Sequence, residues 1–500
     1  MHPTTAPPRP VAKPAVRSSR RNRRQPTLER CEGRTLMTTY TVTTLTDSGA
    51  GRGTVGDLRY CIARANFDGQ RDTITLAVTG TIQLGSSLPT LVNARGITID
   101  GPGAGSLTVR GGGVSASFTM LRVQQGATAA ISGLTFADGS APVAGGAIFN
   151  QGNLTIAGAA FTGNSARRNG GAINNVGTLT IADSTFTGNS VLDTGGGVTG
   201  KTARGNGGAI YNSGPLTIAD STIAGNFAGT GGGGIDSVFT AVKITNTTIV
   251  ANSANVFGGG ISLNGPTDFS DRGGTLTLTN STIVDNIAGR ATGTGYGGGI
   301  GANDSALQID GTSFIGNTSG RRAGGVGVNG GVLSLTHSTF SGNTTGGDGG
   351  GLSINGGVSI TGRGKTGGST LSVDQSTFVA NSAGRRGGAI ESTSTTAKVT
   401  GAILSANAAG SSGGGISLDF DPTFLETHGS LTLTNSTING NTASQSGGGI
   451  NNFDQLTLNN ATITANLAGV AGGGIANAKG LTIRHSTITE NRPNNVAGIT

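Results

Sequence analysis

The feature that most constrains this chain is a sequence unit repeated twelve times from about residue 143 onward. One half of the unit is a glycine pair followed by a small residue and an aliphatic residue, as in 145–148 and 170–173. The other half reads Ser-Thr-(Phe/Ile)-x-x-Asn, and its asparagines are Asn164, Asn189, Asn226, Asn252, Asn286, Asn317, Asn343, Asn381, Asn407, Asn441, Asn466 and Asn491. Neighbouring asparagines stand 25 or 26 residues apart, except across five units that carry insertions. A fixed period of this length is typical of solenoids.

Apolar residues come in three short bursts within each unit. In the first full unit these are 147–148, 154–156 and 160–161, and Leu-Thr-Ile alternates with the period of a half-buried strand. Gly, Asn and Ser separate the bursts and favour turns. The pattern predicts an all-β fold, a right-handed parallel β-helix of about 12 regular coils with three strands in each.

Three columns of the repeat have distinct structural roles. The residue three positions before each asparagine is Phe, Ile or, at Leu404, Leu, and we expect it to point inward and stack on its neighbours. The recurring asparagine predicts a buried ladder in which each side-chain amide bonds the next coil. The glycine pair indicates a tight corner that needs positive φ or close approach of neighbouring coils.

The chain divides into three regions: a basic disordered or targeting tail over 1–37, an N-terminal cap with less regular coils over 38–142, and the regular repeats over 143–500. Within the second region, Leu58, Cys61, Ile62 and Ala65 are spaced as on one helix face, with Asp57 as N-cap. A solenoid end exposes core and unpaired strands, so we expect this short helix to cap the solenoid.

Charge and composition exclude several classes of protein. Residues 1–36 carry nine Lys or Arg and two Glu, a net charge of +7, so only +1 remains of the whole chain's +8. A nucleic-acid-binding domain would carry its basic surface on the folded body, so we expect no nucleic-acid partner. No apolar run is long enough for a transmembrane segment. The two cysteines, Cys31 and Cys61, predict free thiols rather than a disulfide scaffold.

The alternating Gly-Gly-(Ala/Gly)-Ile and Phe-x-x-Asn motifs resemble the repeats of polymorphic outer membrane proteins and related right-handed β-helix surface proteins. Asp47–Gly51, Asp57–Ile62 and Asp72–Ile74 resemble the capping module common ahead of such helices, and 19–37 resembles the N-terminal segment of large exported planctomycete proteins. The resemblance implies a secreted or cell-surface protein, often adhesive, associated with the outer membrane. The first 37 residues lack an apolar signal-peptide region, and no C-terminal outer-membrane barrel is present, so the export route stays open.

Few residues suggest chemistry. Asp183 and Asp220 lie on adjacent coils at the separation of a retaining glycosidase pair, but their column also holds Gly, Asn and His, which favours a left-handed bend. His337 and His485 share that column five coils apart, too far for one metal. We therefore assign no catalytic, cofactor-binding or metal-ligating residue and expect no cofactor.

Arginine pairs recur in one loop just before the glycine pair, at 167–168, 321–322 and 385–386, and Arg290 holds an equivalent place. They indicate either a solvated loop edge or a discontinuous basic stripe for anionic glycans. The outward strand positions are mostly Thr and Ser. A polysaccharide lyase or hydrolase would instead need several Asp, Arg and Lys within two coils.

Three insertions follow the same corner, after Ile261, Leu352 and Ile416, and two of them are close copies. The copies lie five coils apart, about 24 Å, so they cannot form one small-molecule site. Loops carry recognition in solenoids, so the insertions are either duplicated decoration or two equivalent contacts on an extended ligand. The candidate ligand-contact residues are Asp268, Phe269, Asp271, Asp419, Phe420, Asp421, Phe424 and Glu426.

These observations predict an extracellular or cell-surface β-helix with an adhesive or structural role, non-catalytic, that binds a glycan or a cell-surface partner. The alternative is a polysaccharide-active enzyme of the pectate-lyase or polygalacturonase kind. Near the C-terminus, Ala497-Gly498-Ile499 looks like a degraded corner motif, so we expect an open coil there. An open coil predicts self-association through 475–500, or a natural product longer than this chain.

Overall fold

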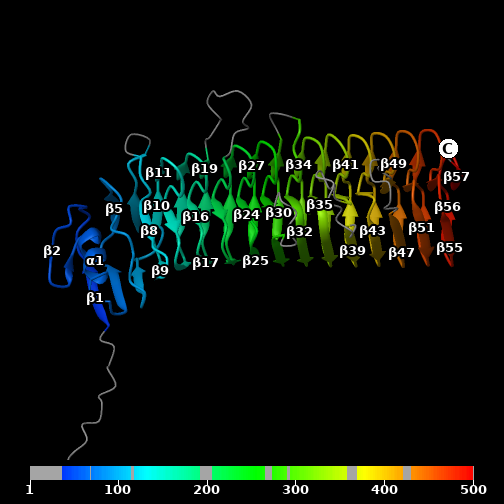
Figure 1. Cartoon of the computed structure of the whole chain (residues 1–500). Coiled ribbons are helices and arrows are strands. Elements are labelled where there is room, and N and C mark those ends of the chain that lie inside the picture. Colours follow the sequence, from blue (N-terminus) through cyan, green and yellow to red (C-terminus); the bar gives the residue numbers. More distant parts are fainter. Residues whose placement is uncertain are drawn as a thin grey trace, which may run out of the picture. The chain divides into compact units, whose positions relative to one another are not determined.

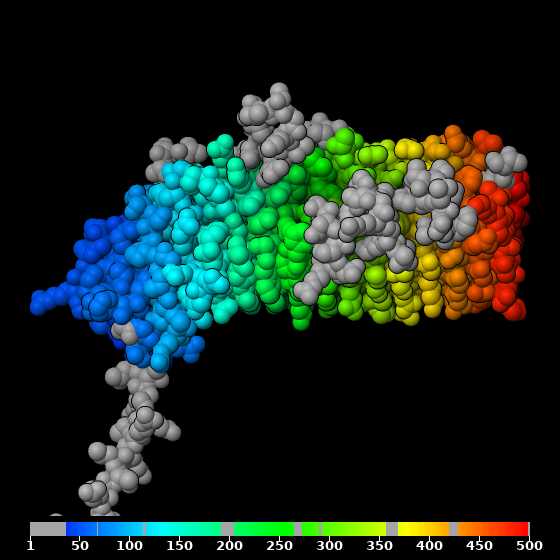
Figure 2. All heavy atoms as spheres, viewed as in Figure 1, coloured from blue at the N-terminus to red at the C-terminus, as the bar shows by residue number. Residues whose placement is uncertain are grey.

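A computed structural model of the chain describes residues 37–67, 69–113, 117–191, 205–264, 273–289, 293–356, 369–419 and 429–498. These residues form a right-handed parallel β-helix whose coils follow one another in sequence order along one axis (Figures 1 and 2). Three sheets of 30, 15 and 12 strands run along the solenoid, and one short helix lies near its N-terminal end. The predicted fold class is confirmed.

Most regular coils contain four strands. In the first full repeat these are β12 (Ile148–Asn150), β13 (Asn153–Ala157), β14 (Ala160–Thr162) and β15 (Ser165–Ala166). β12 and β13 belong to the 30-stranded sheet, β14 belongs to the 15-stranded sheet and β15 belongs to the 12-stranded sheet. The sequence predicts only three strands, because the fourth is two residues long and buries a single small side chain, here Ala166.

The first strand of each coil directly follows the glycine corner. From the third full repeat onward these strands are β20 (Ile210–Asn212), β24 (Ile235–Val238), β28 (Ile261–Asn264), β32 (Ile300–Asp310), β35 (Val326–Thr336), β38 (Leu352–Asn355), β42 (Ile390–Thr393), β46 (Ile416–Asp419), β50 (Ile450–Asn452) and β54 (Ile475–Asn477). They pair in register, aliphatic on aliphatic, as Ile210 does with Ile235. The two 11-residue strands, β32 and β35, run through the turn that elsewhere separates first from second strand.

The interior column before the asparagines is buried in eleven of the twelve repeats, as predicted, and Ile488 in the last coil is partly buried. Phe314, Phe340 and Phe378 are fully buried, with ring centroids 4.5 and 4.7 Å apart on neighbouring coils. Leu404 continues the same column by pairing with Phe378. Stacking at about the strand spacing fills the core without voids.

The predicted asparagine ladder is present in all twelve repeats. Asn164 is typical: its backbone N–H and its side-chain Nδ2 both donate to Asn189 Oδ1, at 3.0 and 2.9 Å. The Nδ2 of Asn189 also donates to the carbonyl of Phe161, 3.0 Å away. Each buried amide is therefore satisfied by neighbouring coils, which makes the ladder a register device.

The glycine pair has both properties that the sequence predicts. Gly170 has φ +63°, and a Cβ on Gly171 would lie 2.2 Å from the carbonyl oxygen of Gly208 in the next coil. The column six residues before each asparagine is also left-handed in all twelve repeats, with φ 48° at Asp183 and 50° at Asp220. Both side chains are exposed, so they are bend residues.

Helix α1 (Leu58–Ala65) confirms the predicted helical segment. The Asp57 side chain accepts a hydrogen bond from Tyr60 N at 2.8 Å, and the four predicted apolar residues are buried. The helix packs on β1 (Thr38–Val42) and β4 (Asp72–Leu76), against the first coil. Cys61 is a buried free thiol, and burial raises its pKa to about 11; Cys31 lies outside the described residues.

The last coil corrects the predicted alignment. Ile475 pairs with Val496 in β57 (Val496–Gly498), so Val496 takes the aliphatic position that the sequence assigned to Ile499. The chain can shorten this coil because Asn495 Oδ1 accepts the ladder hydrogen bonds of Asn491, at 3.1 Å each. Ile483 and Val496 are 45 % and 40 % exposed there, and self-association through this end stays a prediction. In the part of the chain that the structure describes, no helix is both long and apolar enough to cross a membrane.

Candidate functional site

Two columns of side chains meet at the glycine corner, and we call their outward surface the corner face. One column precedes the glycine pair and the other directly follows the aliphatic residue. The first contains Asn206, Gly231, Phe257, Tyr296, Arg322, Asp348 and Arg386, and the second contains Tyr211, Asp236, Ser262, Gly301, Gly327, Ser353, Glu391 and Ser417.

The positive φ of the corner glycine turns the two columns toward each other. A Cβ on Gly301 would lie 2.9 Å from a ring atom of Phe257, and one on Gly231 would lie 3.2 Å from Ser262 Oγ. Side chains on one column therefore contact those on the other across the corner. This contact buries polar groups such as Asp236 and Glu391, which strand alternation alone would leave in solvent.

The insertions interrupt the chain at both ends of the first strand. β28, β38 and β46 each lead into an insertion, and the described residues stop there at 264, 356 and 419. Two further insertions begin between the short fourth strand of one coil and the first strand of the next, at 192 and 290. All five longer units thus break the repeat next to the corner face.

Most candidate ligand-contact residues lie outside the described residues: Asp268, Phe269, Asp271, Phe420, Asp421, Phe424, Glu426, and also Arg290. Asp419 is described, ends β46 and is 4 % exposed. The two copied insertions leave β28 and β46, which stand five pairing steps apart, so the structure does not bring their first residues together.

A charged cluster occupies the corner face over neighbouring coils. Its centre is Asp348, whose side chain is 2 % exposed and accepts from Arg386 Nε at 3.2 Å. Arg385 Nη1 and Arg322 Nε lie 3.8 and 3.9 Å from Asp348 Oδ2. Three arginines from two different coils therefore converge on one buried carboxylate.

Two more carboxylates complete the cluster. Asp419 accepts from Arg386 Nη1 and Ser417 Oγ, both at 3.0 Å. Glu391 is fully buried and accepts from Ser353 Oγ at 2.5 Å and from Thr393 Oγ1. The charge of Arg322 acts to lower the pKa of Glu391. Glu391 and Asp419 each accept a hydrogen bond from a serine hydroxyl.

The electrostatics follow from burial. Desolvation raises the pKa of Glu391 and of Asp419, although Arg322 opposes the shift at Glu391 and Arg386 opposes it at Asp419. Burial alone would lower the pKa of Arg386, but the carboxylates of Asp419 and Asp348 raise it, so this guanidinium stays charged. The arginine charges of the cluster are therefore permanent, whereas the charges of Glu391 and Asp419 depend on pH.

The cluster resolves part of the arginine pattern. The side chains of Arg322 and Arg386 are 22 % and 29 % exposed and form ion pairs with the buried Asp348. The side chain of Arg385 is 63 % exposed. Arg167 and Arg168 are exposed and lie five coils away. The pairs thus form neither a uniformly solvated edge nor a continuous stripe: two pairs join one site and the third does not.

Aromatic side chains occupy the preceding coils of the same face. The rings of Phe257 and Tyr296 are stacked with centroids 6.1 Å apart, and the guanidinium of Arg321 lies over Tyr296 at 5.8 Å. Asp236 is fully buried beside them; its Oδ1 accepts from Asn264 Nδ2 at 3.1 Å, while its Oδ2 has no hydrogen-bond partner among the described residues. Burial raises the pKa of Asp236 to about 7.

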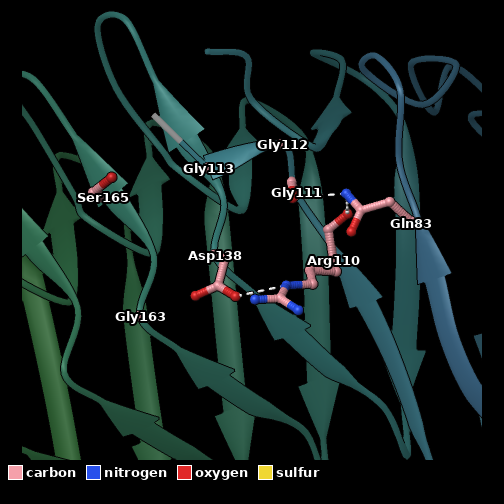
Figure 3. Close-up of a pocket in the computed structure, with 8 residues that line it drawn as sticks. All are labelled: Gln83, Arg110, Gly111, Gly112, Gly113, Asp138, Gly163 and Ser165. Carbon is pink, nitrogen blue, oxygen red and sulfur yellow. Dashed lines mark hydrogen bonds and ion pairs between the residues drawn. The ribbon is translucent and has the colours of Figure 1, made fainter. Parts of the chain in front are cut away.

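A separate shallow depression of about 440 Å³ lies at the start of the regular coils (Figure 3). It is lined by Gln83, Arg110, Gly111, Gly112, Gly113, Asp138, Gly163 and Ser165. Arg110 Nε and Asp138 Oδ2 point toward each other at 2.8 Å and neutralise one another in solvent. Its glycine-rich lining offers fewer directed groups than the corner face.

The two described histidines, His337 and His485, lie at the left-handed bend six residues before a repeat asparagine. His337 Nδ1 lies 3.1 Å from Asp310 Oδ1 and its Nε2 lies 3.0 Å from Gln375 Oε1, which raises the pKa of His337. His485 has the same left-handed backbone. No group of three or more His, Cys, Asp or Glu side chains within the described ranges is placed to hold a metal ion.

Sequence reasoning missed Asp348, Glu391 and Asp236. One signal was available, because the residue directly after the corner aliphatic is Asn, Tyr, Ser or Gly in most repeats and acidic at 236 and 391. That the two columns touch depends on the corner geometry, which the repeat does not reveal.

No protein-family model and no curated protein matches the chain. Among solved structures it is similar to the catalytic domain of a GH87 α-1,3-glucanase in complex with tetrasaccharides (12 % identity, TM-score 0.38, covering 92 % of this chain and 68 % of that one). It is also similar to a mannuronic acid-specific polysaccharide family 6 lyase from human gut microbiota (9 % identity, TM-score 0.33, covering 93 % of this chain and 91 % of that one). A third similar structure is the A-module of the Azotobacter vinelandii mannuronan C-5 epimerase AlgE6 (12 % identity, TM-score 0.32, covering 91 % of this chain and 100 % of that one). The likeness concerns the β-helix fold.

Proposed function

We propose that this protein is an extracellular or cell-surface β-helix that binds glycans along the corner face and has an adhesive or structural role. The observation that carries the proposal is the combination, on one face, of aromatic rings at Phe257 and Tyr296 with arginines pre-positioned by Asp348. Rings present flat apolar surface to a sugar, and guanidiniums present directed donors.

Two further observations support it. The insertions are the variable part of the repeat, and each lies in sequence next to a first strand that carries this face; solenoids place recognition in such loops. The resemblance of the repeats to those of polymorphic outer membrane proteins supports a surface location.

The test is a glycan-array experiment with the purified chain, followed by affinity measurements on the glycans that score. A Phe257→Ala, Tyr296→Ala double variant should lose most of the affinity, because both rings leave the face. Arg110→Gln, in the separate depression, is the control and should bind as the parent does. An array without a reproducible signal, or equal loss in both variants, would contradict the proposal.

A second candidate is a polysaccharide-active enzyme. The specific observation favouring it is that Glu391 and Asp419 are buried carboxyls with raised pKa values, adjoining Arg322 and Arg386 within the same cluster. Perturbed acids beside a fixed cation can serve as general acid and base. Incubation with polygalacturonate and with neutral glucans decides between the two, since product formation abolished by Glu391→Gln requires catalysis.

A further inference from the structure

We propose that the charged cluster of the corner face binds an anionic glycan, one that carries carboxylate or sulfate groups, with Arg321 and Arg385 as its contact residues. This inference rests on the proposed glycan binding and names its ligand class. Four guanidiniums take part. Arg321 lies over the Tyr296 ring. Asp348 pairs with the other three, those of Arg322, Arg385 and Arg386.

The geometry separates the two signs of charge. The carboxylates lie inside, with Asp348 at 2 % and Asp419 at 5 % side-chain exposure and Glu391 fully buried. The guanidiniums lie outside them, and Arg385 is 63 % exposed. A ligand approaching this face therefore meets the guanidinium N–H donors before it meets the carboxylates.

The inner carboxylates also prepare the arginines for an anion. A free arginine loses side-chain entropy when it binds, whereas Arg322 and Arg386 are already held by hydrogen bonds and ion pairs. Each guanidinium has five N–H donors, so donors remain beyond those used internally. Planar guanidinium forks suit carboxylate and sulfate oxygens.

The spacing favours a polymer over a small anion. Arg322 and Arg386 lie two coils apart, about 10 Å along the axis at the strand spacing. A ligand that uses both coils must present anionic groups at a comparable distance, as a charged polysaccharide does. Nucleic acid is the less favoured polyanion, because the chain beyond residue 36 carries a net charge of only +1.

Acidification supplies an independent prediction. Glu391 faces Arg322 and Asp419, and Asp419 faces Arg386 and Asp348. Protonating either acid removes a negative charge beneath the arginines. Because burial raises both pKa values, this happens above the ordinary carboxyl range, and affinity for an anionic glycan should rise as pH falls.

The experiment measures the Kd of the full chain for polygalacturonate, dextran sulfate and neutral dextran, with single-stranded DNA as a further polyanion. Arg321→Gln, Arg385→Gln should weaken binding of the anionic glycans at least about tenfold, as expected for lost charge-assisted hydrogen bonds. It should also reduce the salt dependence. The matched control is Arg167→Gln, Arg168→Gln, an exposed pair of the same loop that lies one residue further from the glycine corner and outside the cluster. Melting temperatures check folding, and Arg385→Lys tests the need for a fork.

The outcomes are distinguishable. Weaker anionic-glycan binding in the cluster variant alone, with tighter parent binding at about pH 5.5 than at about pH 7.5, supports the inference. Selective binding of neutral dextran would overturn it while leaving the proposed function intact. DNA bound as tightly as the anionic glycans, or equal losses in both variants, would overturn it too. Binding of no glycan at all would remove the proposed function itself.

Discussion

Replacing Asp236 by Asn should make the protein more stable at neutral and alkaline pH and leave it nearly unchanged in acid. Asp236 is fully buried, and burial raises the pKa of its carboxyl from 3.8 to about 7. Ser262 and Asn264 hydrogen bonds oppose that shift without cancelling it. An amide of the same shape can keep the acceptor for Asn264 and carries no charge to desolvate.

The sign follows from proton linkage. Below pH 3.8 the carboxyl is protonated in both the folded and the unfolded chain, so it contributes no pH dependence. Between 3.8 and about 7 the unfolded chain loses the proton and the folded chain keeps it, so stability falls as pH rises. A difference of about 3 pKa units corresponds to about 4 kcal/mol, reached near pH 7 and constant above it.

The assay is a series of thermal and urea melts of parent and Asp236→Asn from about pH 4 to about pH 8. Because solenoids open locally, hydrogen exchange of the amides in β24 and β28 should report the same trend at the site itself. Asp183→Asn, at an exposed bend, is the control for removing one carboxylate from the chain. If parent and Asp236→Asn lose stability with pH in parallel, the burial argument is wrong.

Four further predictions can be checked with the same preparations. Phe340→Ala should destabilise by about 3–5 kcal/mol because it opens a cavity in a stacked column, and Phe340→Leu by clearly less; equal melts would refute the interior register. Asn317→Ala should lower stability by at least about 3 kcal/mol, since several buried donors and acceptors of neighbouring coils lose their partner; a change below 1 kcal/mol would contradict the ladder's role. Phe269→Ser and Phe420→Ser should each weaken surface binding without altering the melt, and normal binding by both would make the insertions decoration. Sedimentation over a hundredfold concentration range should show weak association through 475–500, and a strictly monomeric chain throughout would argue against it.

The interior of this protein could be predicted from the sequence because its geometry is one-dimensional. Once the repeat length is known, each residue sits above its equivalent in the preceding coil at the strand spacing, so a column of like residues has to stack. Phe340 and Asn317 therefore lie where the pattern puts them, and Asp183 adopts the left-handed bend that its column indicates. Helix α1 followed from local spacing and an N-cap alone.

The exterior at the corner depended on tertiary structure. Arg386 and Asp348 share one outward column on adjacent coils, whereas Asp419 lies two residues beyond the second column at the end of β46, so the repeat does not show that one arginine reaches both carboxylates. The backbone turn at the glycine pair brings those columns into contact and buries carboxylates that a strand pattern would leave in water. Likewise, Val496 rather than Ile499 continues the aliphatic column, because an asparagine side chain could replace a missing stretch of backbone. Hydrogen-bond satisfaction and corner packing are properties of the assembled coils, and they decided both the candidate site and the end of the solenoid.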